Sequence, residues 1–130
     1  MCMIEDGERA VVYSKRMSRA KKQYQCAECR RTIARGEQYH RAFMVYDGYA
    51  STFRTCQNCA VAVEWLTENC GGAMHGGIEQ DISEHVSEYP RQIGLMRLKI
   101  GMNRRWRRFD GAGLMPVQKL PPTIMESNHA

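Results

Sequence analysis

Two pairs of cysteines are the residues of this 130-residue chain whose type and spacing indicate a chemistry most directly. Cys26 and Cys29 form the first pair and Cys56 and Cys59 the second, with two residues inside each pair. Four thiolates complete the tetrahedral shell of a structural zinc ion and leave no open position for a catalytic water. Four buried free thiols are the alternative, but paired cysteines at this spacing are typical of zinc sites. The spacing therefore predicts one structural zinc ion held by these four side chains.

Basic side chains form the second group. The segment from Arg91 to Arg108 contains seven basic residues and no acidic one, and Trp106 lies between two arginine pairs. Arginine binds phosphates and tryptophan stacks on bases, so this segment is a candidate nucleic-acid-binding surface. A solvated arginine-rich face with Trp106 docked in the core is the competing interpretation. The candidate partner-binding residues here and near the N-terminus are Arg97, Lys99, Arg104, Arg105, Trp106, Arg107, Arg108, Lys15, Arg16, Arg19, Lys21 and Lys22.

Three other arginines lie close to the cysteine pairs in the sequence, namely Arg30, Arg31 and Arg54. Four thiolates on one zinc ion leave a charge of about −2, which nearby cations would offset. We therefore expect these arginines to compensate the charge of the metal site.

The sequence does not predict catalysis. It contains no Gly-x-Ser-x-Gly nucleophile turn, and the expected zinc site has no open position. His40 is a conceivable base, as in nucleases built on a similar scaffold, but no histidine follows Cys59 on the expected helix to hold a catalytic metal. Cys70 and His75 could form a second metal site with Cys2, His40 or His85, but a small buried cysteine at a helix end and a lone histidine without a metal are the favoured interpretation. We expect a non-enzymatic protein without a small-molecule substrate.

The sequence around the cysteines predicts a small α+β fold. Alternating residues from Gln38 to Tyr46 indicate a strand, Asp47-Gly48 a hairpin turn, and Tyr49 to Thr55 the returning strand. Apolar residues after Cys59 repeat at helical spacing until Gly71, where the helix should end. A cysteine knuckle, a hairpin and a helix that carries the second cysteine pair together describe a treble-clef zinc finger.

The other segments are assigned from charge and periodicity. We expect a basic arm over residues 1–22, the zinc domain with a following helix over 23–90, a basic segment over 91–115 and a flexible tail over 116–130 that begins as an extended, proline-containing strap. For residues 91–108 a stripe of apolar residues favours a helix. The glycines in that segment and the alternation from Met96 to Ile100 indicate a strand instead, so the two interpretations compete.

Composition limits the class of protein. A hydrophobic share of 43% and a charged share of 25% are ordinary for a folded globular chain, and the net charge of +5 permits an acidic partner. No apolar run reaches the roughly 18 residues of a membrane span, and the first residues lack the order of a signal peptide. We expect a cytoplasmic protein that does not bind membranes.

Several of these motifs carry a resemblance to a known family. The stretches Ala20–Cys29, Thr32–Tyr39, Asp47-Gly48 and Cys56–Cys59 resemble those of small, largely uncharacterised four-cysteine treble-clef zinc proteins of tailed bacteriophages and prophages. The resemblance implies that the four cysteines are zinc ligands and that the protein is a phage accessory factor acting in the bacterial host cytoplasm. It does not imply an activity, because the treble clef serves unrelated functions.

Two functional hypotheses follow from these observations. In the first, the zinc finger is a scaffold, and basic segments bind the phosphates of DNA or RNA. In the second, the protein is a phage factor that binds a host complex, for example an antiviral defence or transcription complex, and inhibits or redirects it. Basic residues serve this second function too, because a host nucleoprotein complex offers acidic surfaces and phosphate sites.

Overall fold

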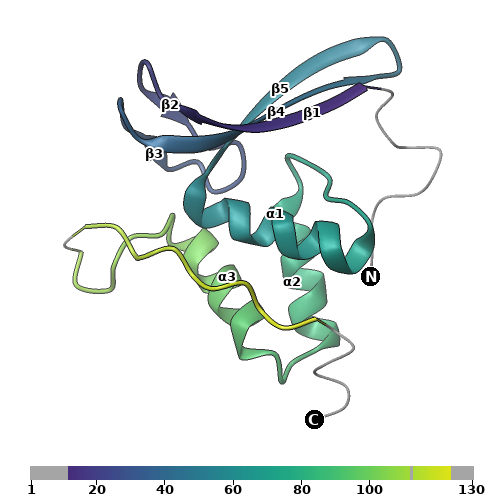
Figure 1. The fold of residues 1–130 in the computed structure, drawn as a ribbon. Coiled ribbons are helices and arrows are strands. Elements are labelled where there is room, and N and C mark those ends of the chain that lie inside the picture. Colours follow the sequence, from purple (N-terminus) through teal and green to yellow (C-terminus); the bar gives the residue numbers. More distant parts are fainter. Residues whose placement is uncertain (1–11, 112, 124–130) are drawn as a thin grey trace.

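The computed structural model describes residues 12–111 and 113–123. Within these residues the chain forms a three-stranded antiparallel sheet, a two-stranded sheet and three helices, which confirms the predicted α+β class (Figure 1). The elements are β1 (Val12–Arg19), β2 (Tyr24–Gln25), β3 (Thr32–Ile33), β4 (Gln38–Tyr46), β5 (Tyr49–Cys56), α1 (Gln57–Cys70), α2 (Ile78–Glu88) and α3 (Ile93–Asn103).

The β4–β5 hairpin has the predicted bounds except that β5 extends one residue further, to Cys56. Its strands pair from Tyr46 with Tyr49 to Tyr39 with Cys56. Asp47 and Gly48 both have positive φ, 52° and 81°, which is the backbone that a two-residue hairpin turn needs to match the twist of its strands. The hairpin therefore delivers Cys56 to the start of α1 in a fixed register.

Strand β1 corrects the prediction of an N-terminal arm over residues 1–22. Residues 12–19 pair with β4 along their whole length, from Val12 with Val45 to Arg19 with Gln38, so β4 is the central strand. This pairing joins residues more than 15 positions apart, and the polar stretch has no local periodicity that would reveal it. Residues 1–11 of the expected arm lie outside the described residues.

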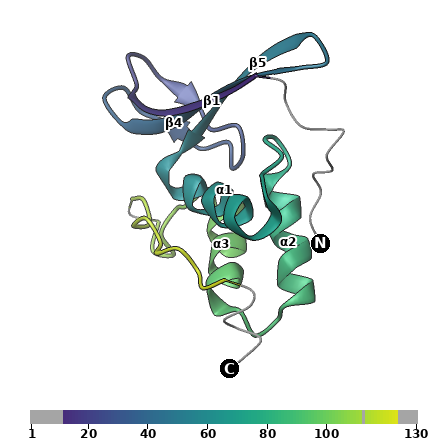
Figure 2. The same ribbon diagram turned by 45° about the vertical axis from the view of Figure 1, so that its right-hand side comes forward.

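The three helices lie on one side of the main sheet (Figures 1 and 2). Helix α1 follows β5 without a loop and ends at Gly71, whose φ of 72° fits the usual glycine C-cap. Trp65, Leu66, Ile82 and Leu98 are fully buried and belong to one core that also includes the four paired cysteines. Within the described residues, no helix combines the length and the apolar character needed to cross a bilayer.

Helix α3 confirms the helical interpretation for part of residues 91–108. It spans Ile93–Asn103, and both of its glycines have a packing role. A Cβ atom at Gly94 would lie 2.9 Å from Pro121, and one at Gly101 would overlap the ring of Trp106. Close packing on two sides therefore outweighs the cost of glycine in a helix.

Residues 116–123, at the start of the expected tail, pack against the helices. They form an extended strap that runs along α3 (Figure 2). Gln118 donates from Nε2 to the carbonyl of Gly94 (2.8 Å), and Trp65 donates from Nε1 to the carbonyl of Pro122 (3.0 Å). The strap accepts the hydrogen bond of a fully buried tryptophan, which its sequence alone does not show. Residues 124–130 lie outside the described residues.

Candidate metal centre

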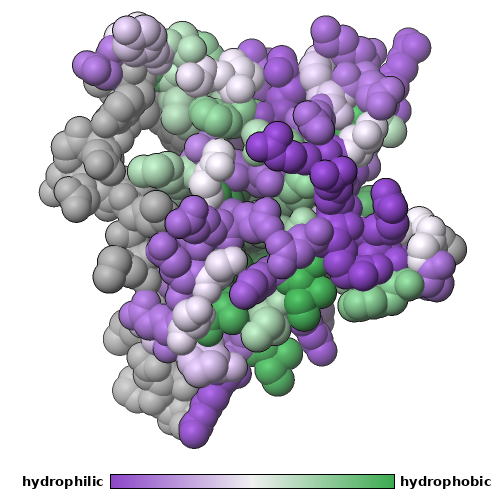
Figure 3. All heavy atoms as spheres, turned by 180° about the vertical axis from the view of Figure 1, so that it is seen from behind, coloured by the Kyte–Doolittle hydropathy of each residue, from purple (hydrophilic) through white to green (hydrophobic). Residues whose placement is uncertain are grey.

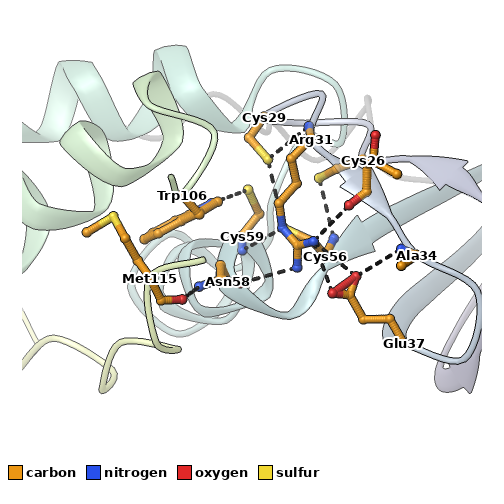
Figure 4. Close-up of polar contacts among 11 residues, drawn as sticks. Cys26, Cys29, Arg31, Ala34, Glu37, Cys56, Asn58, Cys59, Trp106 and Met115 are labelled. Atoms are coloured by element: carbon orange, nitrogen blue, oxygen red, sulfur yellow. Dashed lines mark hydrogen bonds and ion pairs between the residues drawn. The ribbon is translucent and has the colours of Figure 1, made fainter. Parts of the chain in front are cut away.

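The four paired cysteines converge at the junction of the two sheets and α1 (Figure 4). Cys26 and Cys29 lie in the knuckle between β2 and β3, Cys56 ends β5, and Cys59 lies in the first turn of α1. All four side chains are buried, and their sulfur atoms lie within 4.8 Å of one another. These residues can hold a metal ion.

The spacing of the sulfurs agrees with tetrahedral coordination. A metal–sulfur bond of about 2.3 Å places the corners of a tetrahedron about 3.8 Å apart, whereas a disulfide holds its sulfurs at about 2.05 Å. The sulfurs of Cys29 and Cys56 are 3.8 Å apart, and none of the four cysteines forms a disulfide. The separation of Cys29 and Cys56 thus fits a thiolate-bound ion, and the other sulfurs lie within 4.8 Å.

Every one of the four sulfurs accepts a hydrogen bond from an N–H group. Such donors stabilise the thiolate form, which is the form that binds metal. Cys26 accepts from the backbone amides of Glu28 and Cys56 (3.4 Å each). Cys29 accepts from the amide of Arg31 (3.5 Å), and Cys56 accepts from the amide of Cys59 (3.4 Å). Cys59 accepts from the indole Nε1 of Trp106 (3.1 Å).

The local backbone explains this geometry. The knuckle closes through two hydrogen bonds, from Cys26 N to Arg31 O (2.9 Å) and from Arg30 N to Cys26 O (3.1 Å). Arg30 has a φ of 69°, which turns the chain so that the following amide points at Cys29. The amide of Ala27 donates to the carbonyl of Arg54 (2.8 Å) and docks the knuckle on β5. On the other side, the start of α1 presents the amide of Cys59 to Cys56.

The electrostatics of the four thiols favour a bound cation. Hydrogen bonds with the thiols of Cys29 and Cys56 hold the pKa of Cys26 below its ordinary value. Hydrogen bonds with the thiols of Cys26, Cys29 and Cys56 raise the pKa of Cys59 above its ordinary value. Without a cation the first thiolate opposes ionisation of the others, because like charges in one buried site repel. A metal ion removes this conflict and allows all four to ionise.

Arg31 is the arginine most closely built into the centre. Its side chain is buried, and its Nη1 donates to both carboxylate oxygens of Glu37 (3.1 and 3.0 Å; Figure 4). Its Nη2 donates to Oδ1 of Asn58 (3.3 Å), whose amide in turn donates to the carbonyl of Met115 (3.0 Å). Arg31 therefore ties the knuckle to α1 and to the residues before the strap, so this guanidinium is not free to bind a partner.

Glu28 connects the knuckle to helix α2. Its buried carboxylate accepts hydrogen bonds from the amides of Gly76 (2.7 Å) and Ile78 (3.2 Å), at a helix start that lacks a side-chain bond from its own N-cap residue. Burial raises the pKa of Glu28, while these two amides lower it. A negative charge at a helix N-terminus is favourable, so the cap couples the cysteine knuckle to the position of α2. Sequence reasoning missed this role, because the two residues are 48 and 50 positions away from Glu28.

Trp106 follows the second of its two interpretations, in which the side chain is docked in the core. It is 1% exposed, and its ring packs against Gly101. Arg105 and Trp106 both have positive φ, 55° and 59°, which turns the chain back so that the ring enters the core. The amide of Trp106 donates to the carbonyl of Gly101 (2.7 Å), and its indole reaches Cys59. The side chain supports the metal centre and is not available to a ligand.

Two of the arginines around Trp106 contact other residues of the same turn. Arg104 donates to the carbonyls of Arg107 and Arg108 (3.1 Å each) and lies over the ring of Phe109 at 4.1 Å. Arg108 lies 3.5 Å from the carboxylate of Asp110. Arg105 and Arg107 are exposed, as is Arg97 on α3, while Lys99 is half-buried. Arg104 and Arg108 thus stabilise the turn that follows α3.

The basic residues predicted near the N-terminus separate onto the two faces of the main sheet. Lys15 lines a pocket between the sheet and α1, whereas Arg16 lies on the opposite face, because neighbouring residues of a strand alternate. Arg19 donates to the carbonyl of Gly36 (2.6 Å), and Lys21 and Lys22 are exposed in the following turn.

The pocket between the sheet and α1 has a volume of about 560 Å³ and contains His40 and His75. Burial, with Lys15 nearby, lowers the pKa of His40 and lowers that of His75 to about 4. Both imidazoles are therefore neutral at pH 7. Among the described residues, the paired cysteines alone form a group of three or more potential metal ligands, so the pocket does not add a second one.

Comparison with known proteins gives no relative for this chain: no family model matches it, and neither does any curated protein or solved structure. The resemblance to phage proteins thus stays an expectation.

Proposed function

We propose that the metal is one structural zinc ion, that the knuckle, hairpin and α1 form a treble-clef finger, and that the protein is a non-enzymatic nucleic-acid-binding factor. Four cysteine sulfurs at tetrahedral spacing, each with an N–H donor, support zinc, which prefers this closed shell in structural sites. The order of knuckle, hairpin and helix supports the treble clef.

The observation that carries the proposed binding function is the charge of the main sheet. Strands β1, β4 and β5 contain five basic residues and no acidic one; the basic residues are Lys15, Arg16, Arg19, Arg41 and Arg54. In a chain whose 19 basic residues are otherwise accompanied by 14 acidic ones, a sheet with basic residues and no acidic one supports a polyanion partner, and its outward face carries Arg16, Arg41 and Arg54. The metal centre then serves to hold β5 and the knuckle in place beside that surface.

Direct binding tests this proposal. Purified protein is titrated into fluorescently labelled DNA and RNA of about 20 nucleotides, single- and double-stranded, at several salt concentrations. We expect binding whose log affinity falls linearly with log salt, because each neutralised phosphate releases counterions. Absence of binding to every probe at low salt would refute the function.

A second candidate function, a phage factor that binds a host complex, is favoured by helix α3. Ile93, Met96 and Ile100 are 67%, 38% and 38% exposed and lie at helical spacing on one face. Seen from behind, the most hydrophobic residues, in dark green, lie on the helical half of the molecule (Figure 3). Exposed apolar residues beside Arg97 are the composition of a protein-binding patch. A bacterial protein that is recovered with the chain after nuclease treatment, and is lost with Ile93→Asp, would support this candidate.

A further inference from the structure

The strand register places three arginines side by side across the main sheet. Arg16 on β1 pairs with Arg41 on β4, and Arg41 pairs with Arg54 on β5. Neighbouring strands lie about 4.8 Å apart, so the three side chains form one row across the sheet. We call these three residues the arginine row.

The arginine row lies on the face of the sheet that points away from α1. Lys15, Met17, His40, Ala42 and Thr55, which alternate with the row along the strands, line the pocket against α1. Side chains at the intervening positions therefore point to the other face. Arg16 is exposed, and Arg41 and Arg54 are half-buried.

Folding alone does not account for this row. Like charges directly opposite each other on neighbouring strands destabilise a sheet. Among the described residues, none of the three guanidinium groups forms an ion pair, and Nε of Arg54 is buried without a hydrogen-bond partner. Among the described residues, Arg54 is compensated in part by the ring of Tyr24, at 4.3 Å, and by the negative charge expected on the four cysteines, since Cys56 lies two positions along the same strand. An anion that bridges the row would remove the repulsion.

Aromatic residues flank the row along the central strand. Phe43 lies two positions from Arg41 on the same face, half-buried, between Ser14 and Thr52 of the neighbouring strands. Tyr24 lies on the other side, with its ring 5.6 Å from that of Tyr39 and Nζ of Lys22 5.7 Å from its centre. Phosphate-binding groups between aromatic rings are the pattern of sheets that bind unpaired nucleotides.

We propose that the arginine row, with Phe43 and Tyr24, is a binding platform for single-stranded nucleic acid, with the guanidinium groups on phosphates and the rings against bases. This inference rests on the proposed nucleic-acid-binding function and specifies its site. A duplex fits less well, because the major groove admits a helix or a two-stranded ribbon, whereas this surface is three strands wide. A duplex also hides the base faces on which rings stack.

Three variants of equal charge change would locate the site. The row variant carries Arg16→Gln, Arg41→Gln and Arg54→Gln. The control variant carries Arg35→Gln, Arg91→Gln and Lys119→Gln, three exposed residues elsewhere. The loop variant carries Arg104→Gln, Arg105→Gln and Arg107→Gln. Each is first checked for metal content and melting temperature, and its Kd for a single strand of about 20 nucleotides is then measured by fluorescence anisotropy.

We expect the row variant to lose roughly a hundredfold in affinity, because three phosphate contacts disappear, and the other two variants to change less than about threefold. Phe43→Ser should weaken binding about tenfold through lost stacking. A row variant with wild-type Kd would overturn the platform while leaving the proposed function intact. Duplex binding as tight as single-strand binding would overturn it as well. If the wild-type chain binds no nucleic acid, both proposals fail.

Discussion

The two groups of arginines in this protein come together in different ways. Those at positions 104–108 are neighbours in the sequence, yet they end up in a turn in which Arg104 donates to backbone carbonyls and Arg108 meets Asp110. Arg16, Arg41 and Arg54 are up to 38 positions apart, and strand pairing brings them into one row without an ion-pair partner among the described residues. Local charge density marks a turn here, whereas strand register produces the surface that we propose for a nucleic-acid partner.

The largest expected effect comes from removing the metal, which should break both regions at once. Cys56→Ser deletes one ligand at the junction of β5 and α1. Structural zinc contributes about 10–16 kcal/mol, as much as the whole stability of a small domain. We expect loss of stoichiometric metal by elemental analysis and loss of the cooperative thermal transition by circular dichroism.

Cys70→Ser serves as the control for this variant, because Cys70 lies outside the four-cysteine group. It should keep one metal ion per chain. Full metal content in Cys56→Ser would show that the four sulfurs do not form one site.

Removal of Trp106 should have the next largest effect and would sharpen the structural interpretation of the arginines at positions 104–108. Trp106→Ala empties a fully buried site and removes the indole N–H donor to Cys59. We expect a loss of about 3–5 kcal/mol in the free energy of unfolding, measured by urea denaturation.

Phe109 is the matched control, since it lies in the same turn but is 75% exposed. Phe109→Ala should change stability by less than about 0.5 kcal/mol. If Trp106→Ala instead leaves stability unchanged and weakens nucleic-acid binding, the tryptophan is a stacking residue after all.

A smaller effect should come from His75, which lies in the pocket on the face of the main sheet opposite the arginine row. Burial in this pocket lowers the pKa of His75 from 6.5 to about 4. The folded state therefore binds fewer protons than the unfolded state between these values, so this contribution to stability is complete above pH 6.5 and is lost as pH falls toward 4. At about pH 5 the loss is about 2 kcal/mol.

His75→Phe keeps a ring against Phe53 but cannot titrate. Its melting temperature should fall less between about pH 7 and about pH 5 than that of the wild type, with acid effects on the cysteines common to both proteins. Parallel pH profiles of the two proteins would show that His75 is protonated freely in the fold.

The metal ligands and the elements that carry them were predictable because their signals are local. The cysteine spacing, the Asp47-Gly48 turn and the helix stop at Gly71 each follow from a few adjacent residues. The pairing of β1, the contacts of the strap at 116–123 and the cap by Glu28 were not, because each depends on a partner far away in the chain. Trp106 was ambiguous for the same reason, since its burial depends on Gly101 and Cys59 together.

The salt dependence of binding tests the platform most directly. Wild-type protein and the row, loop and control variants are titrated with single-stranded DNA over a range of salt concentrations, and log affinity is plotted against log salt. Each lost phosphate contact on a single strand reduces the slope by about 0.7, so the row variant should lose about 2 in slope while the loop and control variants keep the wild-type value. An equal reduction in all three variants would mean that net charge alone attracts the strand, and it would contradict the arginine row as a defined site.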